Sequence, residues 1–412
     1  MGNIISSILA LLLSVALLLT ANGLLGVLLP VRALSQGFSS IDVGILGTAY
    51  FGGFFLGCLL GPKLVNRVGH IRTFAALTSV VCALTLVHGL FDEKIVWWLA
   101  RCVTGVCFAI LFIVIESWLS EKSTNDNRGA VFSVYTILNL SVVAVGQFTI
   151  TLMSTQGFVL FAVAAILISM STVPVAVSLA SAPADLTASR LRLRYLFDRS
   201  RVAVIGCLGV GMANGAFWTL APVFSKLNTG DINAVAIFMS LTVIAGGLGQ
   251  WPLGWLSDRV DRRRVIAGAG IGASLGGVLV VSLTSVDPNW TYLGAVVFGA
   301  FSFPLYALCA AHLYDVVEPD GYVEATGGLL MAYAAGAIAG PLIASVLMEG
   351  FGANSLFLYT ACIHIAVAVY ANYRMGVQER PLVDEKAAFS DALVMTTALG
   401  EIDPRTEIEE PE

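Results

Sequence analysis

The sequence predicts an all-α membrane protein whose twelve transmembrane helices form two pseudo-symmetric six-helix bundles. Three observations lead to this fold class. Of the 412 residues, 57% are hydrophobic and only 12% are charged, whereas roughly 25% of residues in a soluble domain are charged. The apolar residues fall in runs of about 20, each long enough to cross a hydrocarbon core of about 30 Å as a helix. The two halves of the chain also repeat the same residues at a constant offset.

Helices are the expected spanning elements because lipid cannot hydrogen-bond to the backbone, which leaves α-helices and closed β-barrels. The alternating ten-residue strands of a barrel are not found in the sequence. The first apolar run, from Ile4 to Val31, follows no Lys or Arg and leads into no small-residue cleavage site. We therefore expect it to be retained as the first helix rather than removed as a signal peptide.

The expected spans are apolar throughout and are separated by short polar segments. In the first half they cover residues 4–31, 42–62, 73–91, 95–119, 130–152 and 156–178. In the second half they cover residues 201–224, 232–254, 265–285, 290–314, 325–348 and 353–373.

The basic residues orient the helices. With both termini cytoplasmic, 18 of the 22 Lys and Arg residues lie in inner segments, and only Arg32, Lys94 and Lys226 lie outside. The remaining one, Arg101, falls within a helix. This bias follows the positive-inside rule and predicts a multi-pass protein of the bacterial inner membrane with cytoplasmic N- and C-termini.

The domain boundaries follow from composition. We expect an N-terminal bundle over 1–178, a cytoplasmic linker over 179–200, a C-terminal bundle over 201–375 and a cytoplasmic tail over 376–412. The basic linker either lies on the anionic inner leaflet or is a solvated connection. Ten of the 27 acidic residues lie in the tail, which we expect to be disordered.

An internal repeat relates the two halves. The Ala-Asn-Gly stretch at Asn22 recurs at Asn214, 192 residues later, and the same offset carries the loop 62–72 onto 254–264. An offset of 194 superposes Gly105 on Gly299. Because two unrelated matches at one offset are improbable, the repeat predicts two similar halves.

The second of these loops resembles the cytoplasmic signature of the major facilitator superfamily, with departures at Asp261 and, in the first copy, at Pro62 and Asn66. The matching residues are Gly254, Asp258, Arg259, Arg263 and Arg264. Arg101 followed by Gly105 resembles the helix 4 motif that this superfamily associates with proton coupling. Glu116-Ser117-Trp118-Leu119 resembles a branch of mostly uncharacterised bacterial carriers. The resemblance implies two parallel six-helix halves around a midplane site, functioning as a monomer.

A conformational gate needs charged groups near helix ends that pair in one state and separate in the other. The candidates are Asn66, Arg67, Arg72, Glu116, Arg128, Asp258, Arg259 and Arg263. Glu116 is expected near the cytoplasmic end of its helix, paired at the surface with Arg128 or Arg67 rather than with substrate. The alternative is that the loop charges serve only as topology signals and lipid anchors.

Polar and aromatic side chains inside the helices are the candidates for substrate binding. An intramembrane charge such as Arg101 indicates binding or coupling, the alternative being that its long side chain reaches water. Asn22 and Asn214 occupy matching places, where the alternative is hydrogen bonding between helices. The remaining candidates also suit core packing; the full set is Asn22, Tyr50, Arg101, Gln147, Asn214, Trp218, Tyr306 and Tyr333.

The expected function is secondary transport of a small neutral or anionic organic solute by alternating access, with proton coupling left open. Multidrug efflux is disfavoured because no Asp or Glu falls in the middle third of any expected helix, where an organic cation would need one. A non-transporting sensor or assembly subunit is the alternative of another class. The sequence carries no motif of an enzyme, a cofactor site, a metal site or a nucleic-acid partner.

Overall fold

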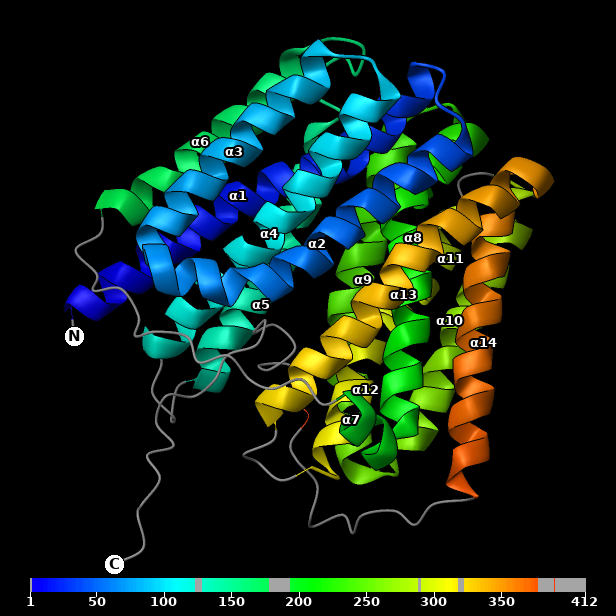
Figure 1. Ribbon diagram of the computed structural model, residues 1–412. Coiled ribbons are helices and arrows are strands. Elements are labelled where there is room, and N and C mark those ends of the chain that lie inside the picture. The colour runs from blue at the N-terminus through cyan, green and yellow to red at the C-terminus, as the bar shows by residue number, and fades with distance from the viewer. Residues whose placement is uncertain are drawn as a thin grey trace, which may run out of the picture.

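The computed structural model describes residues 2–122, 128–177, 193–287, 290–317, 322–376 and 389, and in these ranges the secondary structure is helical. The helices pack side by side in two groups, one from each half of the chain (Figure 1). The expected all-α membrane fold is therefore confirmed.

The first half contains six long helices, one for each expected span. They are α1 (Gly2–Ser35), α2 (Ser40–Val68), α3 (His70–Leu90), α4 (Lys94–Lys122), α5 (Arg128–Thr149) and α6 (Val159–Val177). The capping box of Ser39 and Asp42 begins α2, because each side chain accepts a hydrogen bond from the backbone N–H of the other residue.

The described residues of the second half form eight helices. They are α7 (Leu193–Arg199), α8 (Arg201–Thr229), α9 (Ile232–Arg259), α10 (Arg262–Thr284), α11 (Thr291–Ser302), α12 (Pro304–Tyr314), α13 (Tyr322–Phe351) and α14 (Ser355–Met375). Eleven stretches of the described residues are long and apolar enough to span a membrane, with α11 and α12 counted together, and the apolar part of α5 is shorter.

Two features of the second half differ from the expectations. The span 290–314 is divided at Phe303, because Pro304 has no N–H to continue the helical ladder and occupies the first turn of α12 instead. The short helix α7 lies within the expected linker, and its Leu196 is fully buried in the core of the second half. Arg190 and Arg192 of that linker lie outside the described residues.

We call the end of the molecule at which α1 begins the proximal end and the opposite end the distal end. Because the helices alternate in direction, α2, α4 and α9 finish at the proximal end, whereas α1, α8 and α13 finish at the distal end. In Figure 1 the two groups of helices meet toward the distal end and diverge toward the proximal end.

The internal repeat reappears in the packing. A Cβ at Gly105 would meet the carbonyl oxygen of Tyr50, and one at Gly299 would meet that of Thr242, which is 192 residues beyond Tyr50. These contacts join α4 to α2 and α11 to α9. Glycine is needed at both positions because a side chain would separate the helices. The two halves are thus built by equivalent helix crossings.

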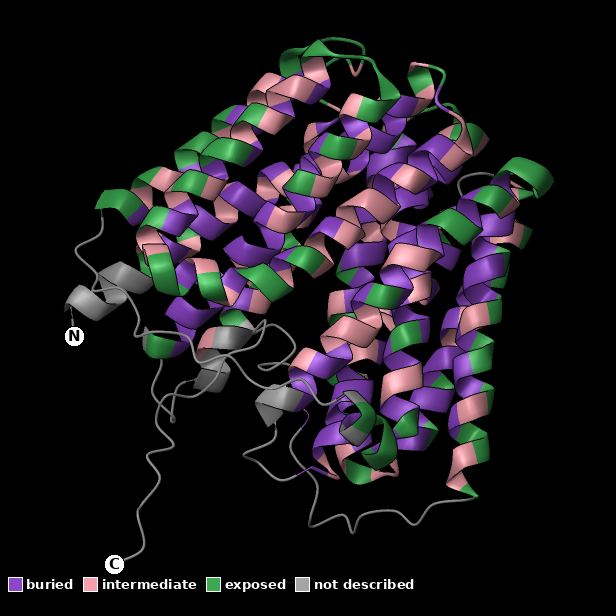
Figure 2. Cartoon of the chain, viewed as in Figure 1, coloured by how far each residue is buried: buried purple, intermediate pink, exposed green. Residues whose placement is uncertain are grey.

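Exposed residues lie along the outer faces of the helices (Figure 2), and many of them have large apolar side chains. Leu248 is 72% exposed and Trp251 is 79% exposed on α9, where a soluble protein would carry polar residues. The buried residues lie along the interiors of the two halves. This pattern is that of a membrane protein whose outer faces contact acyl chains.

Candidate substrate cavity and gate

Two adjoining cavities of about 340 and 320 Å³ lie between the halves. The proximal cavity is lined by Glu116, Asn214 and Tyr306 among others, and the distal cavity by Asn22, Tyr50 and Arg101. Six residues line both: Phe54, Asn139, Leu140, Trp218, Leu330 and Tyr333. Together they form one central space of a size suited to a small organic molecule.

All eight residues proposed from sequence for substrate binding line this space. Their role in binding stays a prediction, but the structure brings them together from α1, α2, α4, α5, α8, α12 and α13. Gln147 is the most enclosed of the eight at 1% exposed, and its side-chain oxygen accepts a hydrogen bond of 3.2 Å from Ser240 in the other half.

Arg101 is the cation of the distal cavity. Its guanidinium carbon lies 4.2 Å from the centre of the Tyr50 ring, in a cation–π arrangement. Within the described part of the chain no carboxylate pairs with it, and its Nε has no hydrogen-bond partner. A positive charge without a counter-charge therefore faces the distal cavity.

Aromatic rings form the wall that the second half contributes. Trp218 stacks on Phe303 with the ring centroids 5.5 Å apart, and the rings of Tyr306 and Tyr333 meet edge to face at 5.2 Å. The helix break at Phe303 brings that ring to the cavity wall. Flat rings with polar edges can both stack against a solute and hydrogen-bond to it.

Glu116 lies near the proximal end of α4, but not at the surface as the sequence suggested. Its side chain is 3% exposed and lines the proximal cavity, with the Tyr135 hydroxyl 3.5 Å from one carboxylate oxygen. The helix continues to Lys122, so Glu116 is more than a turn from its end. The cavity therefore contains a carboxylate. The argument from sequence against the transport of organic cations, which relied on the lack of such a group, no longer holds.

Sequence reasoning also missed Asn139, Phe54 and Leu330. The rule that selected Asn22, a polar side chain within an apolar helix, applies equally to Asn139 on α5. Phe54 and Leu330 carried no such signal, because an apolar residue facing a cavity looks the same in sequence as one facing lipid.

The distal end is closed by hydrogen bonds between the halves. The backbone N–H of Ser40 donates to Glu349 over 3.1 Å, and the Thr48 hydroxyl donates to the carbonyl oxygen of Ile338 over 2.8 Å. Both bonds join α2 to the distal part of α13. A third contact, from Ser240 on α9 to the carbonyl oxygen of Ala144 on α5, spans 3.3 Å.

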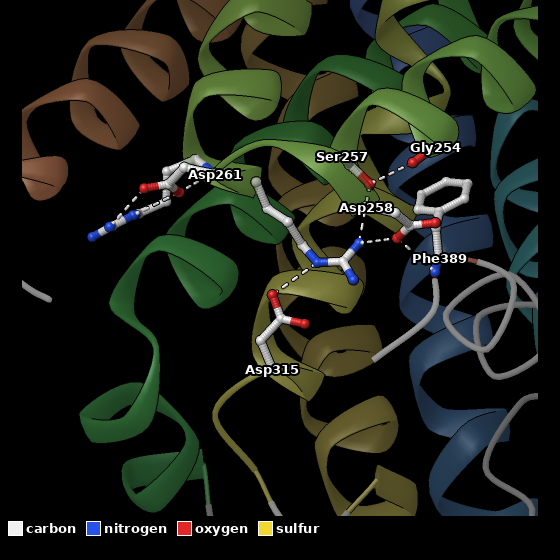
Figure 3. Close-up of polar contacts among 8 residues, drawn as sticks. Gly254, Ser257, Asp258, Asp261, Asp315 and Phe389 are labelled. Carbon is white, nitrogen blue, oxygen red and sulfur yellow. Dashed lines mark hydrogen bonds and ion pairs between the residues drawn. The ribbon is translucent and has the colours of Figure 1, made fainter. Parts of the chain in front are cut away.

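At the proximal end, the gate candidate Asp258 belongs to an ionic cluster around the buried Arg262 (Figure 3). Arg262, which is 1% exposed, bonds to Asp258 at 3.1 Å and to Asp315 at 2.8 Å. It also donates to the Ser257 hydroxyl over 3.0 Å. These bonds tie α9, α10 and the end of α12 together within one half. Asp315 was not among the gate residues chosen from sequence.

The neighbouring arginines, Arg263 and Arg259, make different contacts. Arg263 is 3% exposed and forms an ion pair of 2.8 Å with Asp261, the N-cap of α10. Burial raises the pKa of the Asp261 carboxyl, but the hydrogen bonds and charge of Arg263 outweigh this and hold the pKa below its ordinary value. Arg259 is exposed and lies over the Trp255 ring at 3.9 Å.

Three of the gate candidates of the first half lie at the surface. Asn66 and Arg67 near the end of α2 are exposed, as is Arg72 near the start of α3. Arg128 begins α5, and its side chain lies outside the described residues. The gating roles of all eight candidates stay predictions.

One residue of the expected tail is described and is buried. Phe389 is 4% exposed, its ring fills the space beside Gly254, and its backbone N–H donates to Asp258 over 3.0 Å (Figure 3). A side chain at Gly254 would collide with this ring. The disorder expected of the tail stays a prediction, and the other tail residues beyond 376 lie outside the described part of the chain.

Comparison with known proteins agrees with this architecture. The family model of the Major Facilitator Superfamily matches residues 11–246 and 227–402. The Escherichia coli protein named uncharacterized MFS-type transporter YcaD is 29% identical over 379 residues, covering 90% of this chain and 97% of that protein.

Among solved structures, a point mutant of the nucleoside transporter NupG superposes with a TM-score of 0.76 at 15% identity, covering 89% of this chain and 99% of that chain. The human organic anion transporter MFSD10 gives 0.64 at 14% identity, with the same coverage. These proteins are transporters and not enzymes. With two repeated six-helix halves, a central cavity and a family model that matches most of its length, the chain belongs to the major facilitator superfamily of membrane transporters.

Proposed function

We propose that this protein is a secondary active transporter that moves a small neutral or anionic organic solute across the bacterial inner membrane by alternating access. In this proposal the proximal end and both termini are cytoplasmic, as the distribution of basic residues indicates. The protein acts as a monomer. The observation that carries the proposal is Arg101, a cation that faces the cavity without a counter-charge.

The energetic cost of such a cation explains why a solute would be attracted to it. A charge at membrane depth costs at least about 2.5 kcal/mol unless it is compensated. Stacking on Tyr50 compensates only part of that cost. A carboxylate, phosphate or electron-rich carbonyl on the solute would supply the missing partner, and the aromatic wall would hold its apolar part.

Alternating access is supported by where the halves touch. The hydrogen bonds that join α2 to α13 lie at the distal end, and the buried ionic cluster of the proximal end lies within the second half. This arrangement is that of an inward-facing state. In the outward-facing state we expect the distal bonds to break and the proximal gate residues of the two halves to approach each other.

Proton coupling is part of the proposal, and Glu116 is the group best suited to it. Its carboxylate lines the proximal cavity beside Tyr135, where it can exchange a proton with water that enters from the cytoplasm. It lies 15 residues from Arg101, about 22 Å along the helix at about 1.5 Å per residue, so the two charges do not neutralise each other.

Glu116 also favours a second candidate function, the export of organic cations. A buried carboxylate can pair with a cation and exchange it for a proton, and the aromatic walls suit flat lipophilic compounds. In this alternative Glu116 rather than Arg101 holds the transported compound.

A thermal-shift screen of the purified protein separates the two candidates, because a ligand that binds only the folded state raises the melting temperature. Nucleosides and organic anions come first, since they are the compounds named for NupG and MFSD10. We expect a neutral or anionic compound to raise Tm in the wild type and less so in Arg101→Gln. If only lipophilic cations raise Tm, and Glu116→Gln abolishes the shift, the export of cations replaces the first candidate.

The paired asparagines provide a further test. The double variant Asn22→Ala and Asn214→Ala should bind the same compound more weakly while its expression stays unchanged. Unchanged affinity would remove both residues from the binding site.

A further inference from the structure

A chain of hydrogen-bonding side chains leads from the cavity into the interior of the second half. The Ser302 hydroxyl donates to Asn214 Oδ1 over 3.0 Å and lies 3.0 Å from His364 Nε2. Ser302 and His364 are fully buried, whereas Asn214 and Tyr333 line the cavity.

The number of hydrogens available fixes the direction of these hydrogen bonds. A serine hydroxyl has a single hydrogen, which Ser302 donates to Asn214. Ser302 must therefore accept the hydrogen bond that joins it to His364, which places the imidazole hydrogen on Nε2. Because the Asn214 oxygen is occupied, its amide nitrogen is left to donate into the cavity that Asn214 lines.

The surroundings of His364 favour a neutral ring. Nδ1 points toward the backbone of Thr360 on the same helix and has no hydrogen-bond partner among the described residues. The other described neighbours are the edge-on Phe298 ring of α11 at 5.6 Å and the backbone of Gly270 on α10, which carry no charge. Nothing there would stabilise an imidazolium.

We propose that His364 is a positioning residue that, as the neutral Nε2–H tautomer, orients Ser302 and Asn214 so that the cavity wall of the second half presents the Asn214 amide as a hydrogen-bond donor. This inference rests on the proposed function and narrows its substrate class. The solute must offer an acceptor oxygen, such as a carboxylate, carbonyl or hydroxyl, to Asn214. A second acceptor or an anionic group faces Arg101 on the opposite wall.

The tautomer can be measured without knowing the solute. Protein labelled with 15N-histidine and reconstituted in lipid gives signals for only four histidines, and His364→Gln identifies the one at position 364. We expect the signals of a neutral Nε2–H ring throughout pH 6 to 8. An imidazolium, or a ring with its hydrogen on Nδ1, would overturn the inference.

Ser302→Ala tests whether the hydrogen-bonded side chains act as a unit. Removing the acceptor of the Nε2 hydrogen should shift the His364 signals toward the other tautomer, while those of His70, His88 and His312 stay in place and show that the fold is intact. Unchanged His364 signals would mean that Ser302 does not fix the ring. Because no solute is present, either result is independent of whether the thermal-shift screen finds a neutral or anionic ligand.

Discussion

At the scale of single residues, the charges inside the membrane carry the functional argument. Arg101 was recognisable from sequence because a charge within an apolar span is costly and has to be explained. The structure adds what the sequence could not show, namely that the guanidinium faces a cavity, stacks on Tyr50 and has no carboxylate partner among the described residues.

Arg101→Gln should weaken the binding of a neutral or anionic solute by about 10- to 100-fold. The loss of a charge-assisted hydrogen bond costs about 1.5–3 kcal/mol, and each 1.4 kcal/mol is about tenfold in affinity. Titration of the purified variant with the compound found by thermal shift measures the effect. Arg32→Gln is the matched control, because Arg32 bonds to Gln156 outside the cavity. Equal losses in both variants would show that the effect is not specific to the cavity.

Asp261 gives a pH dependence of stability. Because its pKa is lowered in the folded protein, the carboxylate stabilises the fold above its ordinary pKa of about 4, and this contribution disappears as the pH falls through the lower folded value. Melting temperatures between pH 3 and 7 should therefore fall less steeply toward acid in Asp261→Asn, which keeps an N-cap but lacks the charge. Parallel curves of melting temperature against pH for wild type and variant would show that the ion pair with Arg263 adds nothing to stability.

Residues that the sequence misplaced share one physical cause. Which of Arg262 and Arg263 reaches Asp258, and whether Glu116 faces lipid, water or the cavity, depends on where a helix begins and how it is rotated. A hydropathy pattern locates the span to within a few residues and says little about rotation. One residue of error turns a helical side chain by about 100°.

At the scale of helices, most of the architecture could be predicted from sequence. The length of each apolar run gave the spans, and the repeat gave the equivalence of the halves. The division at Phe303 was missed although Pro304 was visible, because a proline within a span often only kinks the helix. The docking of Phe389 had no local signal, since its partners Gly254 and Asp258 lie more than 100 residues away.

The close helix crossings make a paired prediction. A Cβ at Gly53 would strike the carbonyl group of Cys102 on α4, whereas one at Gly52, its neighbour on the same helix, meets no atom within 4 Å. Gly53→Ala should therefore force α2 and α4 apart and lower the melting temperature by several degrees, while Gly52→Ala should leave it unchanged or raise it. Thermal unfolding in detergent measures both. Similar behaviour of the two variants would contradict the packing described for α2 and α4.

At the scale of the whole molecule, the proposed alternating access requires a single sequence to serve two arrangements of its halves. The equivalent crossings at Gly105 and Gly299 stabilise each half internally, as does the Arg262 cluster in the second half. The halves can therefore rotate against each other without being rebuilt. The sequence did not indicate which arrangement would be observed, because both arrangements use the same helices and differ only in the contacts between halves.

The distal closure and the proximal opening should therefore exchange when a solute is transported. Spin labels can be attached in a background without the seven native cysteines, provided that ligand binding is retained. Lys63 and Arg264 are exposed near the proximal end, one in each half, and Phe91 and Val286 are their counterparts near the distal end.

Distances between these labels, measured by double electron–electron resonance in lipid nanodiscs with and without the compound found by thermal shift, test alternating access most directly. We predict that the compound adds a population in which the distance from residue 63 to residue 264 is shorter and the distance from residue 91 to residue 286 is longer. If both distances stay fixed, or both change in the same direction, the halves do not rock about the cavity and the proposed mechanism is wrong.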